Sequence, residues 1–137
     1  MKLVIDNNIV FSIMKPDSAS SFLFYKLLEQ GYEFFAPLDL VEEFDNHEDE
    51  CFTKSKISID NFKLRKKEVF SKINLIELSY YKEEIHKIIN SLSDKDDVSY
   101  MALALKFSCP LWSNDPILKN QNKVRVLSTE DLIEVFL

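Results

Sequence analysis

Glycine is nearly absent from this sequence: its 137 residues include only one, Gly31. Average usage of ~7% would give about ten in a chain of this length. Phosphate-binding loops such as the P-loop and the GxGxxG turn need several glycines, because the backbone must approach the phosphate closely. The sequence therefore excludes a glycine-rich phosphate cradle, and any phosphate chemistry must rely on side chains.

Cysteine and long apolar runs are also scarce. The two cysteines, Cys51 and Cys109, provide no disulfide framework and no CxxC pair, so we expect free thiols in a reducing compartment. No apolar run approaches the ~18 residues of a membrane span. The N-terminus leads directly into a predicted strand rather than a targeting segment. We therefore expect a cytoplasmic protein that does not bind membranes.

Basic residues are outnumbered, with 17 Lys and Arg against 23 Asp and Glu and a net charge of −6. This balance disfavours a passive nucleic-acid binder, which would carry a net basic face. A hydrophobic fraction of 46%, with 11 Phe, five Tyr and one Trp, indicates a packed core. The length suits one domain, which we expect to span residues 1–137.

Short apolar segments alternate with segments of helical periodicity along the chain. The predicted strands cover residues 3–5, 32–36, 73–78, 111–112 and 124–127. The predicted helices cover residues 18–30, 80–92 and 94–107, a segment that begins at Pro37, a segment with near-helical spacing within 54–72, and a last segment from Ser128. Gly31 stands where a glycine typically ends a helix. The alternation is typical of an α/β fold with a parallel sheet.

Acidic residues follow or precede several of these strands. Asp6 ends the first strand, Asp115 follows the fourth, Glu43 lies on the helix after the second, and Asp96 and Asp97 open the helix before the fourth. Ligands of parallel sheets bind at the carboxyl ends of the strands, near the switch point of strand order. Converging carboxylates repel one another unless a cation neutralises them, and Mg²⁺ and Mn²⁺ prefer oxygen ligands. The pattern predicts a divalent-metal site or carboxyl groups with raised pKa values.

Each acid taken alone has a simpler explanation. Asp96 and Asp97 suit a helix start, Glu43 belongs to an acidic run, and Asp115 precedes a proline, as turn residues often do. Asp6 alone has no such simpler explanation, because an apolar residue would pack better than an acid directly after a buried strand. The joint placement of these acids carries the prediction.

Four segments, in order, resemble the motifs of the PIN domain, a family of metal-dependent nucleases. Residues 4–10 (VIDNNIV) resemble its opening hhDxNhh, and residues 37–44 (PLDLVEEF) its second motif. Residues 94–105 (DKDDVSYMALAL) are similar to the third, and residues 111–115 (LWSND) to the fourth. The family also includes the toxins of VapBC toxin–antitoxin pairs.

The resemblance implies a set of metal-binding, catalytic carboxylates. They are Asp6, Glu43, Asp97 and Asp115. Glu42 is the alternative to Glu43 in the second motif, and Asp96 is the alternative to Asp97 in the third. The polar residues implied to support the carboxylates are Asn8, Asp96 and Ser113.

The resemblance also implies a three-layer α/β/α fold with a five-stranded parallel sheet of order 3-2-1-4-5. In that order the first and fourth strands are neighbours, so Asp6 and Asp115 would flank the switch point. The implied function is a ribonuclease that hydrolyses RNA phosphodiesters with Mg²⁺ or Mn²⁺, the toxin of a toxin–antitoxin pair being one form. An antitoxin protein and a second copy of the chain would be its partners. The alternative is a non-catalytic binding or scaffold domain of the same fold.

One block of positive charge stands out against the acidic whole. Residues 54–72 hold seven basic and two acidic residues, so the block carries +5 while the rest of the chain carries −11. We expect the block to follow an RNA backbone, although the solvent face of an amphipathic helix explains it too. The expected RNA-binding residues are Lys63, Arg65, Lys66 and Lys67.

The remaining aromatic and imidazole groups carry weaker predictions. Trp112 stands beside the expected site, where it could stack on a base or fill the core. Neither His47 nor His86 has the spacing of a zinc ligand, and we expect both on the surface or packed on helices.

Overall fold

The computed structural model describes residues 1–91 and 97–136, and its strands form one parallel sheet of order β3-β2-β1-β4-β5. The strands are β1 (Lys2–Ile5), β2 (Glu33–Pro37), β3 (Ile73–Ile76), β4 (Leu111–Trp112) and β5 (Val126–Leu127). Val4 pairs with Leu111 and Ile5 with Trp112, so β1 and β4 meet at the switch point of strand order. The predicted fold class and strand order are confirmed.

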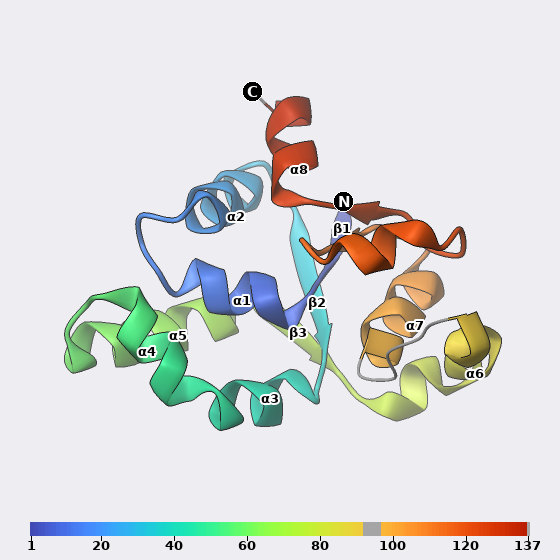
Figure 1. Ribbon diagram of the computed structural model, residues 1–137, viewed down its shortest axis with the longest axis horizontal. Coiled ribbons are helices and arrows are strands. Elements are labelled where there is room, and N and C mark those ends of the chain that lie inside the picture. The colour runs from blue at the N-terminus through green and yellow to red at the C-terminus, as the bar shows by residue number, and fades with distance from the viewer. Residues whose placement is uncertain (92–96, 137) are drawn as a thin grey trace.

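Helices cover both faces of this sheet. They are α1 (Asn7–Ile13), α2 (Ala19–Glu29), α3 (Leu40–Asn46), α4 (Glu48–Ser55), α5 (Ile59–Ser71), α6 (Leu78–Ile88), α7 (Val98–Phe107) and α8 (Thr129–Phe136), with 3₁₀ turns η1 (Ile89–Ser91) and η3 (Pro116–Asn120). Figure 1 shows α1 and α2 on one side of the sheet and α6 and α7 on the other, which gives the expected three layers. None of the described helices is long and apolar enough to span a membrane.

Local signals in the sequence explain several helix ends. The Ser18 side chain accepts a hydrogen bond from the Ser21 amide and starts α2, and Gly31 follows the end of α2 with a φ of +85°. That φ lies in the left-handed region that glycine adopts without strain. At the start of α8, Ser128 and Asp131 cap each other: the Asp131 amide donates to Ser128 Oγ (3.0 Å), and the Ser128 amide donates to Asp131 Oδ2 (2.9 Å).

Several predicted elements differ in the structure, including the third strand, which ends at Ile76 rather than Leu78. Pro37 does not start a helix: it ends β2 opposite Ile76, and α3 begins only at Leu40. The fixed φ of proline suits an extended residue at a strand end, where the missing amide disturbs the ladder least. The fifth strand covers only Val126–Leu127. Residues 7–13 form α1, a helix that no pattern in the sequence predicted.

The core fills the space between the sheet and its helices. Trp112 is completely buried, and its indole N–H donates to Thr129 Oγ1 at 3.0 Å. Its ring lies 6.0 Å from that of Phe34. Of the two roles considered for Trp112, the structure supports core packing, because a buried ring presents no face to a nucleic-acid base.

Candidate active site

Asp6 lies where β1 ends and α1 begins, at the switch point of the sheet. Its amide donates to the Trp112 carbonyl (3.0 Å), which continues the pairing of β1 with β4. Its side chain accepts from the Asn7 amide (2.8 Å) and from Ser113 Oγ (2.6 Å) and is 1% exposed. Burial raises the pKa of this carboxyl; the two hydrogen bonds oppose the shift, and the negative charge of Asp115 adds to it. Asp6 is therefore a helix cap held next to a second carboxylate.

Glu43 approaches the same edge of the sheet from α3. Its Oε2 accepts from Asn7 Nδ2 (2.9 Å) and its Oε1 from the Tyr100 hydroxyl (2.7 Å). Burial raises the pKa of Glu43 against these hydrogen bonds, and the charges of Asp39 and Asp6 raise it further. The neighbouring Glu42 is exposed. The structure thus brings Glu43, rather than Glu42, into electrostatic contact with Asp6.

Ser113 connects Asp6 to Asp115. The buried Ser113 hydroxyl donates to Asp6 Oδ2 and accepts from the Asp115 amide at 3.1 Å. Asp115 in turn accepts from the Ile117 amide (3.0 Å) and starts the 3₁₀ turn η3. One hydroxyl therefore fixes the side chain of one acid and the backbone of the other.

The structure describes only part of the third predicted motif, residues 94–105. Asp97 is half-buried at the N-cap of α7, and Asp96 lies outside the described residues. Across residues 1–91 and 97–136, no three His, Cys, Asp or Glu side chains stand close enough together to hold a metal ion as they are placed. The chemistry of the donors nevertheless suits Mg²⁺ or Mn²⁺, since they are carboxylate oxygens whose mutual repulsion a cation would relieve.

Two residues of the site were not predicted. Asn7 holds Glu43, whereas the predicted Asn8 is exposed and lines a neighbouring pocket. Tyr100 donates to Glu43 and is 1% exposed. A signal for Tyr100 exists in the sequence, because it follows Asp97 by three residues and so lies on the same side of one helical turn.

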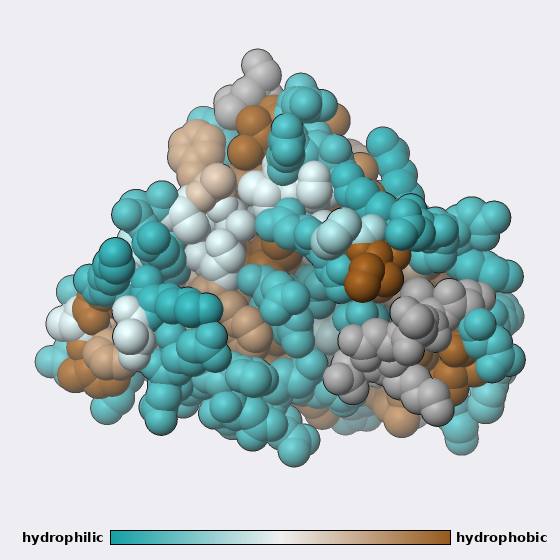
Figure 2. Space-filling view, in the orientation of Figure 1, coloured by the Kyte–Doolittle hydropathy of each residue, from teal (hydrophilic) through white to brown (hydrophobic). Residues whose placement is uncertain are grey.

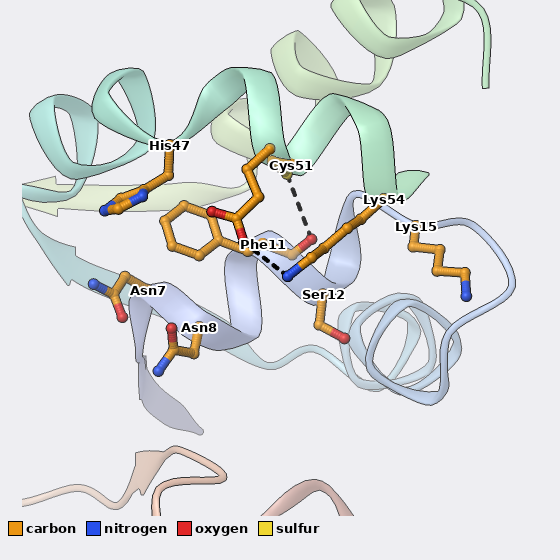
Figure 3. A pocket seen from close by; sticks show the side chains of 9 residues that line it. Asn7, Asn8, Phe11, Ser12, Lys15, His47, Cys51 and Lys54 are labelled. Carbon is orange, nitrogen blue, oxygen red and sulfur yellow. Dashed lines mark hydrogen bonds and ion pairs between the residues drawn. The ribbon is translucent and has the colours of Figure 1, made fainter. Parts of the chain in front are cut away.

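A pocket of about 510 Å³ opens beside the carboxylates, between α1 and α4 (Figure 3). Its lining residues are Asn7, Asn8, Phe11, Ser12, Lys15, His47, Glu50, Cys51 and Lys54. His47 is exposed, and its ring lies 5.8 Å from that of Phe11. Asn7 belongs both to this lining and to the hydrogen bonds of Glu43, so the pocket adjoins the carboxylate site.

The basic block is divided between internal contacts and free surface. Arg65 donates through Nε and Nη2 to the Ile13 carbonyl (3.0 and 2.7 Å) and also to Ser21 Oγ. Lys66 lies 3.5 Å from Asp45 and 3.0 Å from Glu48. Lys63 and Lys67 are exposed. Figure 2 shows a mostly hydrophilic surface over α3 and α4.

A family model and one of two solved structures compared with this chain agree with this fold. The family model described as PIN domain matches residues 4–131. A chain of VapBC2 from Rickettsia felis, solved bound to a DNA fragment from their promoter, has 16% identity and a TM-score of 0.66; the match covers 93% of this chain and 98% of that one. A PilT N-terminus domain protein from Sulfolobus solfataricus P2 also has 16% identity, with coverages of 100% and 94% and a TM-score of 0.43. No curated protein matches significantly.

Proposed function

The chain belongs to the PIN domain family, and we propose that it is an endoribonuclease that depends on Mg²⁺ or Mn²⁺. The observation that supports this most directly is the placement of Asp6 and Glu43. Both carboxyl groups lie at the carboxyl edge of a parallel sheet, at its switch point, with raised pKa values. The proposed metal-binding residues are Asp6, Glu43, Asp97 and Asp115.

Each residue of the site has a definable task in this proposal. A divalent ion bound by the carboxylates would supply an activated water and neutralise charge on the phosphodiester. Ser113 orients Asp6, while Asn7 and Tyr100 orient Glu43, through the hydrogen bonds described above. Burial of Cys51 raises the pKa of its thiol to about 11, so a thiolate nucleophile is not part of the proposal.

The test is cleavage of labelled single-stranded RNA with Mn²⁺, with Mg²⁺ or with EDTA. We expect wild type to cleave only with metal, and Asp6→Asn and Glu43→Gln to lose cleavage by at least about 100-fold. Glu42→Gln is the matched control, because it makes the same chemical change one residue away on an exposed side chain. If wild type cleaves nothing, the chain is better explained as a non-catalytic binding or scaffold domain. If Glu43→Gln and Glu42→Gln cleave equally, the cleavage does not use Glu43 and the proposed site is refuted.

We also propose that this nuclease acts as the toxin of a toxin–antitoxin pair. The support is the family, together with the fold shared with a VapBC2 chain. Expression should arrest growth of a bacterial host, and co-expression of the protein from an adjacent reading frame should restore it. An Asp6→Asn variant that arrests growth equally would separate the toxicity from the carboxylate site. We further propose that the chain forms the homodimer that the resemblance implies, and light scattering of the purified chain would test this.

A further inference from the structure

The pocket between α1 and α4 has no role in the chemistry proposed above, although it adjoins the carboxylates. Figure 3 shows Asn7 and Asn8 at one end of the pocket and Lys15 at the other, with Lys54 reaching across from α4. At the first end, Asn7 Nδ2 bonds Glu43 at 2.9 Å. An extended substrate that lies across the carboxylates can therefore continue directly into the pocket.

Basic side chains outnumber acidic ones in the lining of the pocket, although the chain as a whole is acidic. The lining holds Lys15 and Lys54 against one acid, Glu50, while the whole chain carries −6. Lys54 pairs with Glu50 at 2.9 Å, with side chains 74% and 62% exposed, and Lys15 lies 3.9 Å from the exposed Asp17. Ion pairs this exposed are weak, so a phosphate can displace the carboxylates at little cost.

Other groups in the pocket match the remaining parts of a nucleotide. Asn8 and Ser12 offer hydrogen-bonding side chains. The exposed His47 ring, set edge-on to Phe11 at 5.8 Å, offers a face on which a base can stack. A volume of about 510 Å³ falls within the range of small-ligand pockets.

We infer that this pocket binds a nucleotide of single-stranded RNA that flanks the cleaved phosphodiester, with Lys15 and Lys54 holding its phosphates. The inference rests on the proposed function and adds to it where the substrate is gripped. Carboxylates that repel a polyanion cannot supply this affinity. On α5, Arg65 and Lys66 are already engaged by the Ile13 carbonyl and by acidic side chains.

The test is the binding of a fluorescein-labelled single-stranded RNA in EDTA, followed by anisotropy over a range of salt concentrations. In Lys15→Ala/Lys54→Ala, two phosphate contacts are lost. The slope of the logarithm of the association constant against the logarithm of the salt concentration should therefore become shallower by about 1.4, which corresponds to about 25-fold weaker binding at 0.1 M salt. The control is Lys82→Ala/Lys87→Ala, which removes the same charge from exposed positions on α6. This control should bind like wild type.

Three results would overturn the inference. They are no binding by wild type, an equal loss in both double variants, and a larger loss in Lys63→Ala/Lys67→Ala, which would place the RNA along α5. Because EDTA prevents metal-dependent cleavage, binding is measured separately from the proposed activity. A protein that binds through Lys15 and Lys54 but never cleaves would refute the nuclease and keep the pocket. If wild type cleaves RNA but Lys15→Ala/Lys54→Ala binds it with an unchanged salt slope, the nuclease is supported and the pocket is refuted.

Discussion

Replacing Asp6 by Asn should stabilise the metal-free protein while abolishing its proposed activity. Asparagine has the same shape as aspartate, and its Oδ1 can still accept from the Asn7 amide. Its Nδ2 can donate to Ser113 Oγ, but the buried Ser113 hydroxyl, which already accepts from the Asp115 amide, then loses the acceptor of its own proton. The substitution therefore keeps the cap of α1 and the contact with Ser113, removes a charge on a residue that is 1% exposed, and gives up the hydrogen bond that Ser113 donates.

The size of the effect follows from opposing contributions. Burying a carboxylate costs several kcal/mol, and each hydrogen bond to it stabilises the charge by about 1.5–3 kcal/mol. The raised pKa of Asp6 shows that burial and the charge of Asp115 outweigh the two hydrogen bonds. We expect Asp6→Asn to gain about 0.5–2 kcal/mol, as when other strained site residues are neutralised. At about 3 °C per kcal/mol for a chain of this size, the gain is measurable.

The gain should depend on pH in a defined direction. A carboxyl whose folded-state pKa lies above its ordinary value of 3.8 opposes folding when it is charged. The penalty is fully present above the folded-state pKa, declines as the pH falls through that pKa, and is gone below the unfolded value. The advantage of Asp6→Asn over wild type should therefore be largest at neutral pH and disappear toward pH 4.

The assay is thermal denaturation in EDTA between pH 4 and pH 8. Asp131→Asn is a control of opposite sign: hydrogen bonds from Lys119 and the Ser128 amide lower the pKa of Asp131 to about 2, so its charge stabilises the fold at neutral pH. That variant should melt below wild type at pH 7. Equal or lower stability of Asp6→Asn at pH 7, or an advantage that grows in acid, would refute the assigned balance of burial against hydrogen bonding.

Three further substitutions test other parts of the structure. Tyr100→Phe removes a donor that lowers the pKa of Glu43, so the acid limb of the pH–rate profile for cleavage should move to higher pH; an unchanged profile contradicts the positioning role. Arg65→Ala should lower the free energy of unfolding by about 2–3 kcal/mol, because hydrogen bonds from its guanidinium to α1 and α2 are lost. Its control is Lys63→Ala, which changes an exposed side chain and whose free energy of unfolding should lie within about 0.5 kcal/mol of wild type in denaturant titrations. Gly31→Ala should cost about 1 kcal/mol in thermal denaturation, from its φ of +85° alone, since open space surrounds the added Cβ.

The alternation of strands and helices could be predicted because its signals are local and repeated, whereas the strand order was implied by the resemblance to the PIN domain. Buried parallel strands appear as short apolar runs, and the order in which strands and helices alternate restricts the sheets that can form. The pairing of Ile5 with Trp112 then sets Asp6 near Ser113 and Asp115. This part of the candidate site follows from the strand order alone.

The parts that were missed depend on tertiary contacts. α1 has only seven residues and begins with two asparagines, which are poor helix formers. It is held by its Asp6 cap and by the burial of Ile9, Val10 and Ile13. Because α1 was not predicted, neither was Asn7 as the partner of Glu43. The spacing of Tyr100 from Asp97 predicts only its side of α7; its hydrogen bond to Glu43 also depends on the approach of α7 to α3, which no local pattern reports.

The acids of the site also build the local fold, and this decides which variants can isolate catalysis. Asp6 caps α1, and Asp115 accepts from the Ile117 amide to start η3. An alanine at either position removes a carboxylate and a cap together, and loss of a cap costs about 1 kcal/mol. An asparagine keeps the cap and removes the charge. If the carboxylates act in catalysis, Asp115→Asn should lose cleavage while its melting temperature stays at that of wild type. Asp115→Ala should lose cleavage and also melt at a lower temperature than wild type.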